Sequence, residues 1–203
     1  MKEFSVVMAL VDYIPVALFA AAAVLLLRDL YHKMRKSAFA LFAAGTVNII
    51  CAGALKATYK LLYAAGICDF QSLDHMFFPV QSLGFLLAGV AMLMLLCGGR
   101  KTRVLAVAPP VFSGTFLFVG MMVAGLGCLD AGLGYIAAKM KKPFAVVCFA
   151  VSFVCSLCMG YLSSQDFAQA AMNWMAEGIN VVGQGSLLLG VWTLHKAGLA
   201  DWK

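Results

Sequence analysis

The fold is decided near the start of the chain by the apolar stretch IPVALFAAAAVLLL (residues 14–27), which is followed directly by RDLYHKMRK (residues 28–36). The first stretch has no charged residue, and the second is rich in lysine and arginine. An α-helix needs about 20 apolar residues to cross a hydrocarbon core of about 30 Å. Residues 8–30 therefore predict a transmembrane helix that ends at a basic loop.

The composition of the whole chain extends this pattern. Of 203 residues, 64% are hydrophobic and 12% are charged, and the mean hydropathy is +0.94. Soluble domains carry about 25% charged residues on average. A water-soluble fold of this size could not bury so much apolar surface. We therefore expect a single all-α domain over residues 1–203, a polytopic helical bundle integral to a plasma or inner membrane, with the lipid bilayer as its surroundings.

The basic residues and the cysteines each have a simple interpretation. The formal charge is +6, but the basic residues flank apolar runs, which indicates membrane topology and no nucleic-acid partner. Most of the seven cysteines lie inside apolar runs, where a thiol behaves as a small hydrophobe. The pair Cys155 and Cys158 has CxxC spacing, but no histidine or acidic ligand lies beside it, so packing is the favoured interpretation.

Motifs for chemistry are sparse. The three histidines, His32, His75 and His195, lie near span ends without HxxxH or HExxH spacing, so neither a metal site nor a cofactor is predicted. There is no GxSG motif and no phosphate loop. These features favour a protein that is not an enzyme, and no catalytic residue is assigned.

Five spans are clear from length and composition: 8–30, 38–62, 74–97, 143–162 and 171–195. The intervening region 104–138 holds 35 residues and one charge, Asp130. It is too long for one ordinary span and short for two. One crossing gives six helices and two crossings give seven.

An internal repeat bears on this ambiguity. KMRKSAFA (33–40) resembles KMKKPFA (139–145), and an apolar helix follows each. Asp74 and Gln81 are seven residues apart, as are Glu177 and Gln184. These similarities predict two three-helix repeats. The predicted boundaries are repeat 1 at about 8–97, a linker helix at about 104–120, and repeat 2 at about 121–195.

The positive-inside rule favours seven helices. Parallel repeats would put the basic loops on one face, which we expect to be cytoplasmic, with the N-terminus outside. Six helices would make the repeats inverted and divide the basic loops between both faces. Against seven, two helices of about 16 residues would reach only about 24 Å each. We favour seven and keep six as the alternative.

A layout of three helices, one linker helix and three helices resembles that of the SWEET and PQ-loop transporters. The Pro-Gln pair of that family is absent from this chain. The resemblance therefore covers layout alone, and no residue roles transfer.

The last span carries a polar stripe. Asn173, Glu177, Asn180 and Gln184 follow one another at spacings of four, three and four, which places them on one helical face about 16 Å long. Charged and polar groups inside a membrane are costly. The stripe either lines a solute path or forms hydrogen bonds between helices, and we favour the path.

Two other spans add polar groups. Asp74, His75 and Gln81 lie near one another on the third span, where Pro79 is expected to kink the helix. The second span contributes three more side chains, Asn48, Lys56 and Lys60. Lys60 is expected to snorkel at the interface, whereas the deeper Lys56 could pair with Asp74 or Glu177.

Asp130 lies among glycines in GLGCLDAGLG (125–134). Closely spaced glycines permit close helix contacts or a break in the backbone. An acid there is either a proton or cation site inside the membrane or part of an outer loop, and the sequence leaves both open.

The leading hypothesis is a small transporter or channel for a polar or cationic solute, acting alone or as the substrate-binding subunit of a larger transporter. The candidate binding residues are Asn48, Lys56, Asp74, His75, Gln81, Glu177, Asn180 and Gln184. The alternatives are a membrane enzyme that acts on a lipid through Asp74, His75 and Glu177, and a non-catalytic receptor or assembly protein. A homo-oligomer and an energy-coupling partner both remain open.

Overall fold

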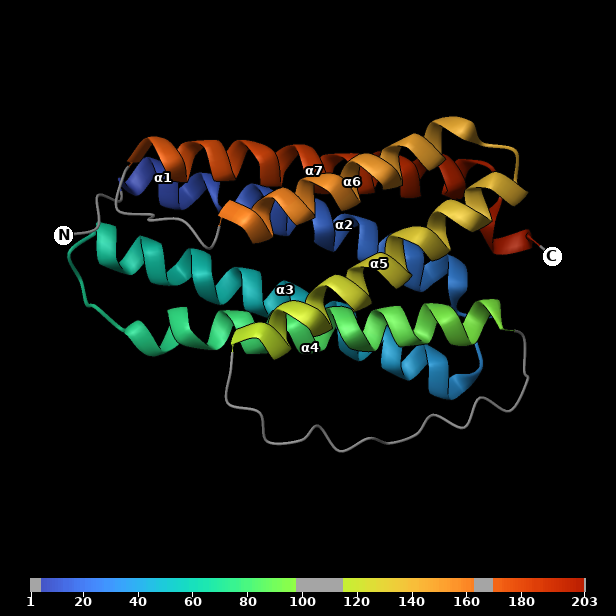
Figure 1. Cartoon of the computed structure of the whole chain (residues 1–203), viewed down its shortest axis with the longest axis horizontal. Coiled ribbons are helices and arrows are strands. Elements are labelled where there is room, and N and C mark those ends of the chain that lie inside the picture. The colour runs from blue at the N-terminus through green and yellow to red at the C-terminus, as the bar shows by residue number, and fades with distance from the viewer. Residues whose placement is uncertain (1–4, 98–114, 163–169, 203) are drawn as a thin grey trace.

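The computed structural model describes residues 5–97, 115–162 and 170–202, which are helical with short connections and contain no strand (Figure 1). The all-α class is therefore confirmed. The helices are α1 (Val6–Val11), α2 (Tyr13–Leu30), α3 (Lys36–Ala64), α4 (Gln71–Leu96), α5 (Thr115–Lys139), α6 (Pro143–Leu162) and α7 (Ala170–Lys196), followed by the short 3-10 helix η1 (Leu199–Asp201).

Five helical segments of the described chain are long and apolar enough to cross a membrane: Val6–Leu30, Lys36–Ala64, Gln71–Leu96, Leu117–Lys139 and Pro143–Leu162. These segments indicate a multi-pass membrane protein. Helix α7 is also long, at 27 residues, but its acid and its amides lower its hydropathy below that of the other five.

The first span is interrupted at Asp12, between α1 and α2. Pro15 has no N–H to donate to the carbonyl of Val11, and its ring crowds that carbonyl. The helix therefore breaks one turn before the proline, at a residue that carries a carboxylate. Pro79, by contrast, lies inside α4, which continues from Gln71 to Leu96.

Helices α4 and α5 run in the same direction. Gly125 of α5 lies against the backbone of Phe85, and Gly132, two turns later, lies against the side chain of Met92. The residue numbers at the contacts therefore increase in the same direction along both helices, as in a parallel pair. Helix α3 is antiparallel to α4, because Gly45 contacts Ala88 and Gly84 contacts Ile49.

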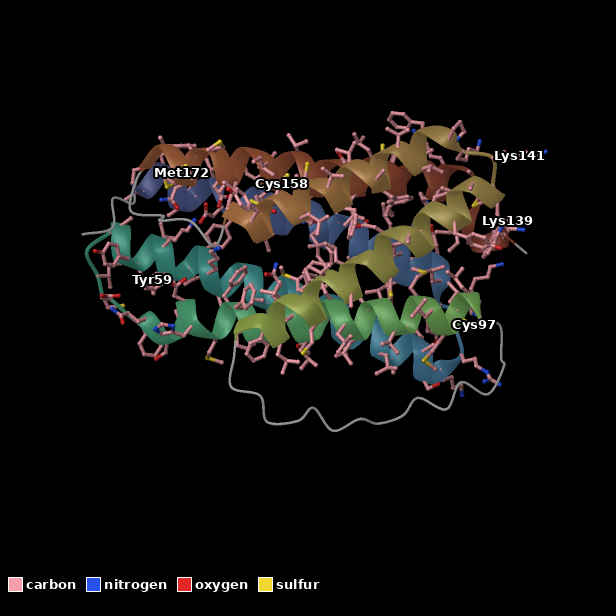
Figure 2. The ribbon with its side chains drawn as sticks, viewed as in Figure 1. Tyr59, Cys97, Lys139, Lys141, Cys158 and Met172 are labelled. Carbon is pink, nitrogen blue, oxygen red and sulfur yellow. The ribbon has the colours of Figure 1, made fainter. Side chains whose placement is uncertain are left out.

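The helices form a closed ring. Each helix from α2 to α7 packs against the next in chain order, and α7 packs against α2. Helices α3 and α6 run opposite to the other four, as Figure 1 shows. Cys97, Lys139 and Lys141 lie at one end of the bundle, and Tyr59 and Met172 lie at the other (Figure 2). We call the first the basic end. We call the second the cavity end, because a cavity lies in the half of the bundle nearer to it.

The turn from α5 to α6 at the basic end follows from local sequence. Lys141 has φ 56°, a left-handed conformation that often ends helices. Pro143 is the first residue of α6, a position where its fixed φ suits the helix and its missing N–H costs nothing. The basic motif that suggested a repeat thus forms a tight reversal.

The ambiguous region is partly described. Helix α5 is continuous over 25 residues, which is longer than the helices of about 16 residues expected for two crossings. Most of the predicted linker helix at 104–120 falls in residues 98–114, outside the described residues. The count of seven and the two repeats remain predictions. Of the two alternatives left open for Asp130, the structure excludes the outer loop, because this residue lies inside α5 and is 3% exposed.

Candidate functional site

A cavity of about 140 Å³ lies between the helices in the half of the bundle nearer the cavity end. The junction of α1 and α2 contributes to its lining, as do α3, α4, α5, α6 and α7. An engineered cavity of about 150 Å³ lined by aliphatic and aromatic side chains holds one benzene molecule. The cavity therefore matches a solute about as large as one six-membered ring.

The walls of the cavity combine apolar and amide surfaces. Aromatic and sulfur-containing side chains form the apolar part: Phe19, Phe77, Phe78, Phe85, Met122 and Met159. Three amides also line the cavity, Gln81 from α4 and Asn180 and Gln184 from α7. A largely apolar lining with a few converging polar groups is typical of small-molecule sites.

A buried ion-pair network stands at the cavity. The Lys60 ammonium is 2.5 Å from Asp12 Oδ2 and 3.4 Å from Glu177 Oε1. The three side chains are 5% to 8% exposed, and they join the α1–α2 junction, α3 and α7. Removing one partner of such a network leaves a buried charge uncompensated. The expectation that Lys60 snorkels at the interface was wrong, because α1, α2 and α7 cover it.

Lys56 lies one helical turn from Lys60 and lines the cavity. Its ammonium is 4.3 Å from the ring centroid of Phe77, a cation–π geometry. It interacts electrostatically with the acids Glu177, Asp12 and Asp74 and with Lys60. The cluster thus holds three carboxyl groups and two lysine amines.

Several buried oxygens at the cavity lack hydrogen bonds. Asp12 Oδ1, Glu177 Oε2 and Gln184 Oε1 have no partner in the described part of the chain, and all three residues line the cavity. A buried polar atom without a partner costs about 1–3 kcal/mol. All three atoms are acceptors, and the Asp12 and Glu177 carboxyl groups also lie within hydrogen-bond reach of each other. Hydrogen-bond donors from an occupant would satisfy the whole set.

The structure brings together five of the eight candidate binding residues. Lys56, Gln81, Glu177, Asn180 and Gln184 line the cavity. The other three, Asn48, Asp74 and His75, are not among the residues that line it. His75 is exposed and Asp74 is half-buried near Lys56. The role of all eight in binding stays a prediction.

Asp12 is the main residue that the sequence analysis missed. It lies within the predicted span 8–30 and makes the shortest contact of the ion-pair network. The available signal was a carboxylate inside an apolar span, which by default suggests a functional site.

The acid–base set of the enzyme hypothesis is not assembled at the cavity. His75 is exposed and outside the lining, whereas Glu177 is buried within it. General acid–base catalysis needs such groups within hydrogen-bond reach of a common substrate. Within the described residues there is also no group of three histidine, cysteine or acidic side chains that could hold a metal ion.

No family model matches the chain, no curated protein matches it, and no solved structure matches it. The function is therefore argued from the site itself.

Proposed function

We propose that this protein is a membrane transporter whose cavity binds a small cation that donates hydrogen bonds through N–H groups. The observation that carries the proposal is the set of three unpartnered acceptor oxygens on Asp12, Glu177 and Gln184. An ammonium or guanidinium group offers several donors and no acceptor, so it matches this set.

Charge supports a cation over an anion. Three acids interact with the two lysines beside the cavity, so acidic groups outnumber basic ones there. Charge-assisted hydrogen bonds to carboxylates are roughly twice as strong as neutral ones. The aromatic walls, Phe77 and Phe78 among them, add ring faces that attract cations. A compact, planar, positively charged solute satisfies all of these features.

Close helix packing supports a transporter over a permanently open channel. From the depth of the inner cavity wall toward the basic end, Gly45 lies against Gly84 and Ala88, and Gly89 lies against Gly125. A Cβ at any of these glycines would press on a neighbouring backbone. Small residues let helices approach closely in membranes. The cavity therefore ends on packed helices, and solute release on that side requires a conformational change.

The proposal also specifies the orientation of the bundle in the membrane and two three-helix repeats. Lys36, Lys139, Lys141 and Lys196 stand at the basic end, so the positive-inside rule favours a cytoplasmic basic end and a cavity on the outer side. Two parallel repeats, α2–α4 and α5–α7, agree with the helix directions. In this arrangement Gln81 and Gln184 occupy equivalent places, and both line the cavity.

Cysteine labelling tests the orientation. In a background without the native cysteines, Lys36→Cys and Lys141→Cys are both exposed sites at the basic end. Cys68, restored as a control, is exposed in the loop between α3 and α4 at the other end. We expect an impermeant thiol reagent to label the two lysine positions from one side and Cys68 from the other. Labelling of Lys36→Cys and Lys141→Cys from opposite sides would contradict parallel repeats.

Solute flux tests the function. We expect proteoliposomes containing the protein to take up methylguanidinium, which is small, planar and permanently charged. Tetramethylammonium has the same charge but no N–H donor, and we expect its uptake to be weaker by about tenfold or more, because sites built for hydrogen bonds reject analogues that lack them.

Two variants complete the flux experiment. Gln184→Leu removes one unpartnered acceptor and leaves the ion-pair network intact, so uptake should fall. Thr193→Val is the matched control, because Thr193 is a polar residue of the same helix outside the cavity lining, and uptake should be unchanged. Equal uptake of both cations, or no difference between the two variants, would refute the proposed site.

A further inference from the structure

Asp130 is a second buried acid, distinct from the ion-pair network. It lies in α5, nine residues before the helix ends at Lys139, which is about 14 Å from the basic end at 1.5 Å per residue. Its side chain is buried, and the one polar side chain that interacts with its carboxyl group in the described part of the chain is Ser152. A carboxylate in such a place must be neutralised.

The surroundings of Asp130 contain no counter-charge. The helices that pack against α5 are α4 and α6. From α4 the neighbouring contacts are apolar, such as Met92 and Leu96 against Gly132. From α6 the nearby polar group is the hydroxyl of Ser152, with the thiols of Cys148 and Cys155 about one turn to either side. Among the described residues, no charged group interacts with Asp130.

These surroundings favour a proton over a metal cation. Hard cations such as Ca²⁺ and Mg²⁺ require about six or more oxygen ligands. Here the described side chains offer the carboxyl group and one hydroxyl. A proton needs a single oxygen and turns the carboxylate into a neutral group that tolerates apolar surroundings.

Asp130 lies directly beyond the inner limit of the cavity. Met122 and Leu126 of α5 line the cavity, and Asp130 follows them at the same spacing of four residues. On α6, Ser156 lines the cavity, and Ser152 lies one turn closer to the basic end. The Asp130 carboxyl therefore lies one turn beyond the cavity lining, on the side of the basic end.

We infer that Asp130 is a proton-binding site, loaded in this conformation and emptied to the basic side when the helices rearrange, and that it couples solute movement to a proton gradient. Proton binding at Asp130 is independent of the proposed function, whereas the coupling rests on it. The protonated, neutral carboxyl group is compatible with the closed helix packing. The ionised carboxylate favours a rearrangement of the helices that exposes it to water.

Infrared spectroscopy of the protein in lipid tests proton binding without any solute. We expect a carbonyl band of a protonated carboxyl group at neutral pH that disappears in Asp130→Asn and shifts in Asp130→Glu. Asp69→Asn is the control, because Asp69 is an exposed loop acid that accepts hydrogen bonds from Tyr59 and Gln71. A wild-type band that survives in Asp130→Asn, or a band removed equally by both variants, would overturn the assignment.

Transport of methylguanidinium tests the coupling. A pH gradient should drive accumulation in wild-type proteoliposomes and fail to do so in Asp130→Asn, while exchange of labelled for unlabelled solute without a gradient continues in both. Gradient-driven accumulation that persists in Asp130→Asn, or accumulation that follows a sodium gradient, would overturn the coupling. Absence of exchange in the wild type would instead refute the proposed function and leave the infrared result to decide proton binding.

Discussion

The two ends of the bundle differ in how completely their polar side chains are hydrogen-bonded. At the basic end, His195 Nδ1 is 2.7 Å from Asp29 Oδ2, and Arg28 donates to His195 Nε2 at 2.7 Å. Lys33 also donates to the carbonyl of Trp202, at 2.5 Å. Around the cavity, by contrast, three acceptor oxygens remain without partners, and the buried carboxyl group of Asp130 lies one turn farther toward the basic end. Hydrogen bonds are nearly complete in stable cores, so the incomplete end is where a solute is expected.

The helices also pack more closely toward the basic end than toward the cavity end. Glycines bring the backbones of α3, α4 and α5 into contact from the inner cavity wall toward the basic end, whereas phenylalanine and methionine side chains surround the cavity on the other side. Well-packed interiors have few voids larger than a water molecule. One half of the bundle thus provides rigidity, and the other retains space and unmet hydrogen-bonding capacity.

The largest effect is expected from breaking the ion-pair network at the cavity end. Lys60→Met leaves Asp12 and Glu177 buried without their cation, and loss of one partner in a buried pair costs about 3–5 kcal/mol. We expect a markedly lower melting temperature in detergent. Lys139→Met, an exposed lysine at the basic end, is the control and should melt like the wild type. Equal melting of both variants would show that the network is not structural.

The sequence was sufficient to predict the helices because the signal is local. Length and hydropathy placed the first span at 8–30, and the structure has Val6–Leu30. The polar stripe of α7 was likewise visible from spacing alone. In each case the prediction needed residues of one helix only.

The sequence was not sufficient to predict which polar groups pair. Lys60 and Glu177 are separated by 117 residues, and their approach depends on α7 packing beside α2. Lys60 also lies near the end of a span, a place where lysines usually reach water. The interruption of the first span at Asp12 depends on Pro15, which lies about one turn away. From the sequence we expected a proline to disturb a helix only at Pro79. Spacing within a helix does not encode these relations between helices.

The second prediction tests the packed half. In Gly125→Ala, the added Cβ would collide with the backbone of Phe85, so overpacking should lower stability by about 1–3 kcal/mol. Gly120→Ala is a matched change in the same helix, where a Cβ meets nothing within 4 Å. There the higher helix propensity of alanine should leave stability equal or slightly raised. Thermal unfolding of the pair measures the difference, and identical shifts would contradict close α4–α5 packing.

The third prediction separates stability from function. Asp29→Asn weakens a charge-assisted hydrogen bond at the basic end, which is worth about 1.5–3 kcal/mol at most. The melting temperature should fall, yet methylguanidinium uptake by the folded protein should not change, because Asp29 is outside the cavity lining. Uptake lost together with stability would show that the basic end takes part in solute binding.

The smallest effect is expected from a neutral hydrogen bond at the cavity end. The Tyr13 hydroxyl and Thr58 Oγ1 are 2.8 Å apart and join α2 to α3 next to Asp12. Tyr13→Phe should cost about 0.5–1.5 kcal/mol, the usual net value of one hydrogen bond. This is well below the cost of Lys60→Met, although both changes affect the same pair of helices. A loss as large as that of Lys60→Met would mean that polar contacts in general hold this end together. The expected smaller loss would show that the charged groups hold this end together. Two of these groups, Asp12 and Glu177, also line the cavity.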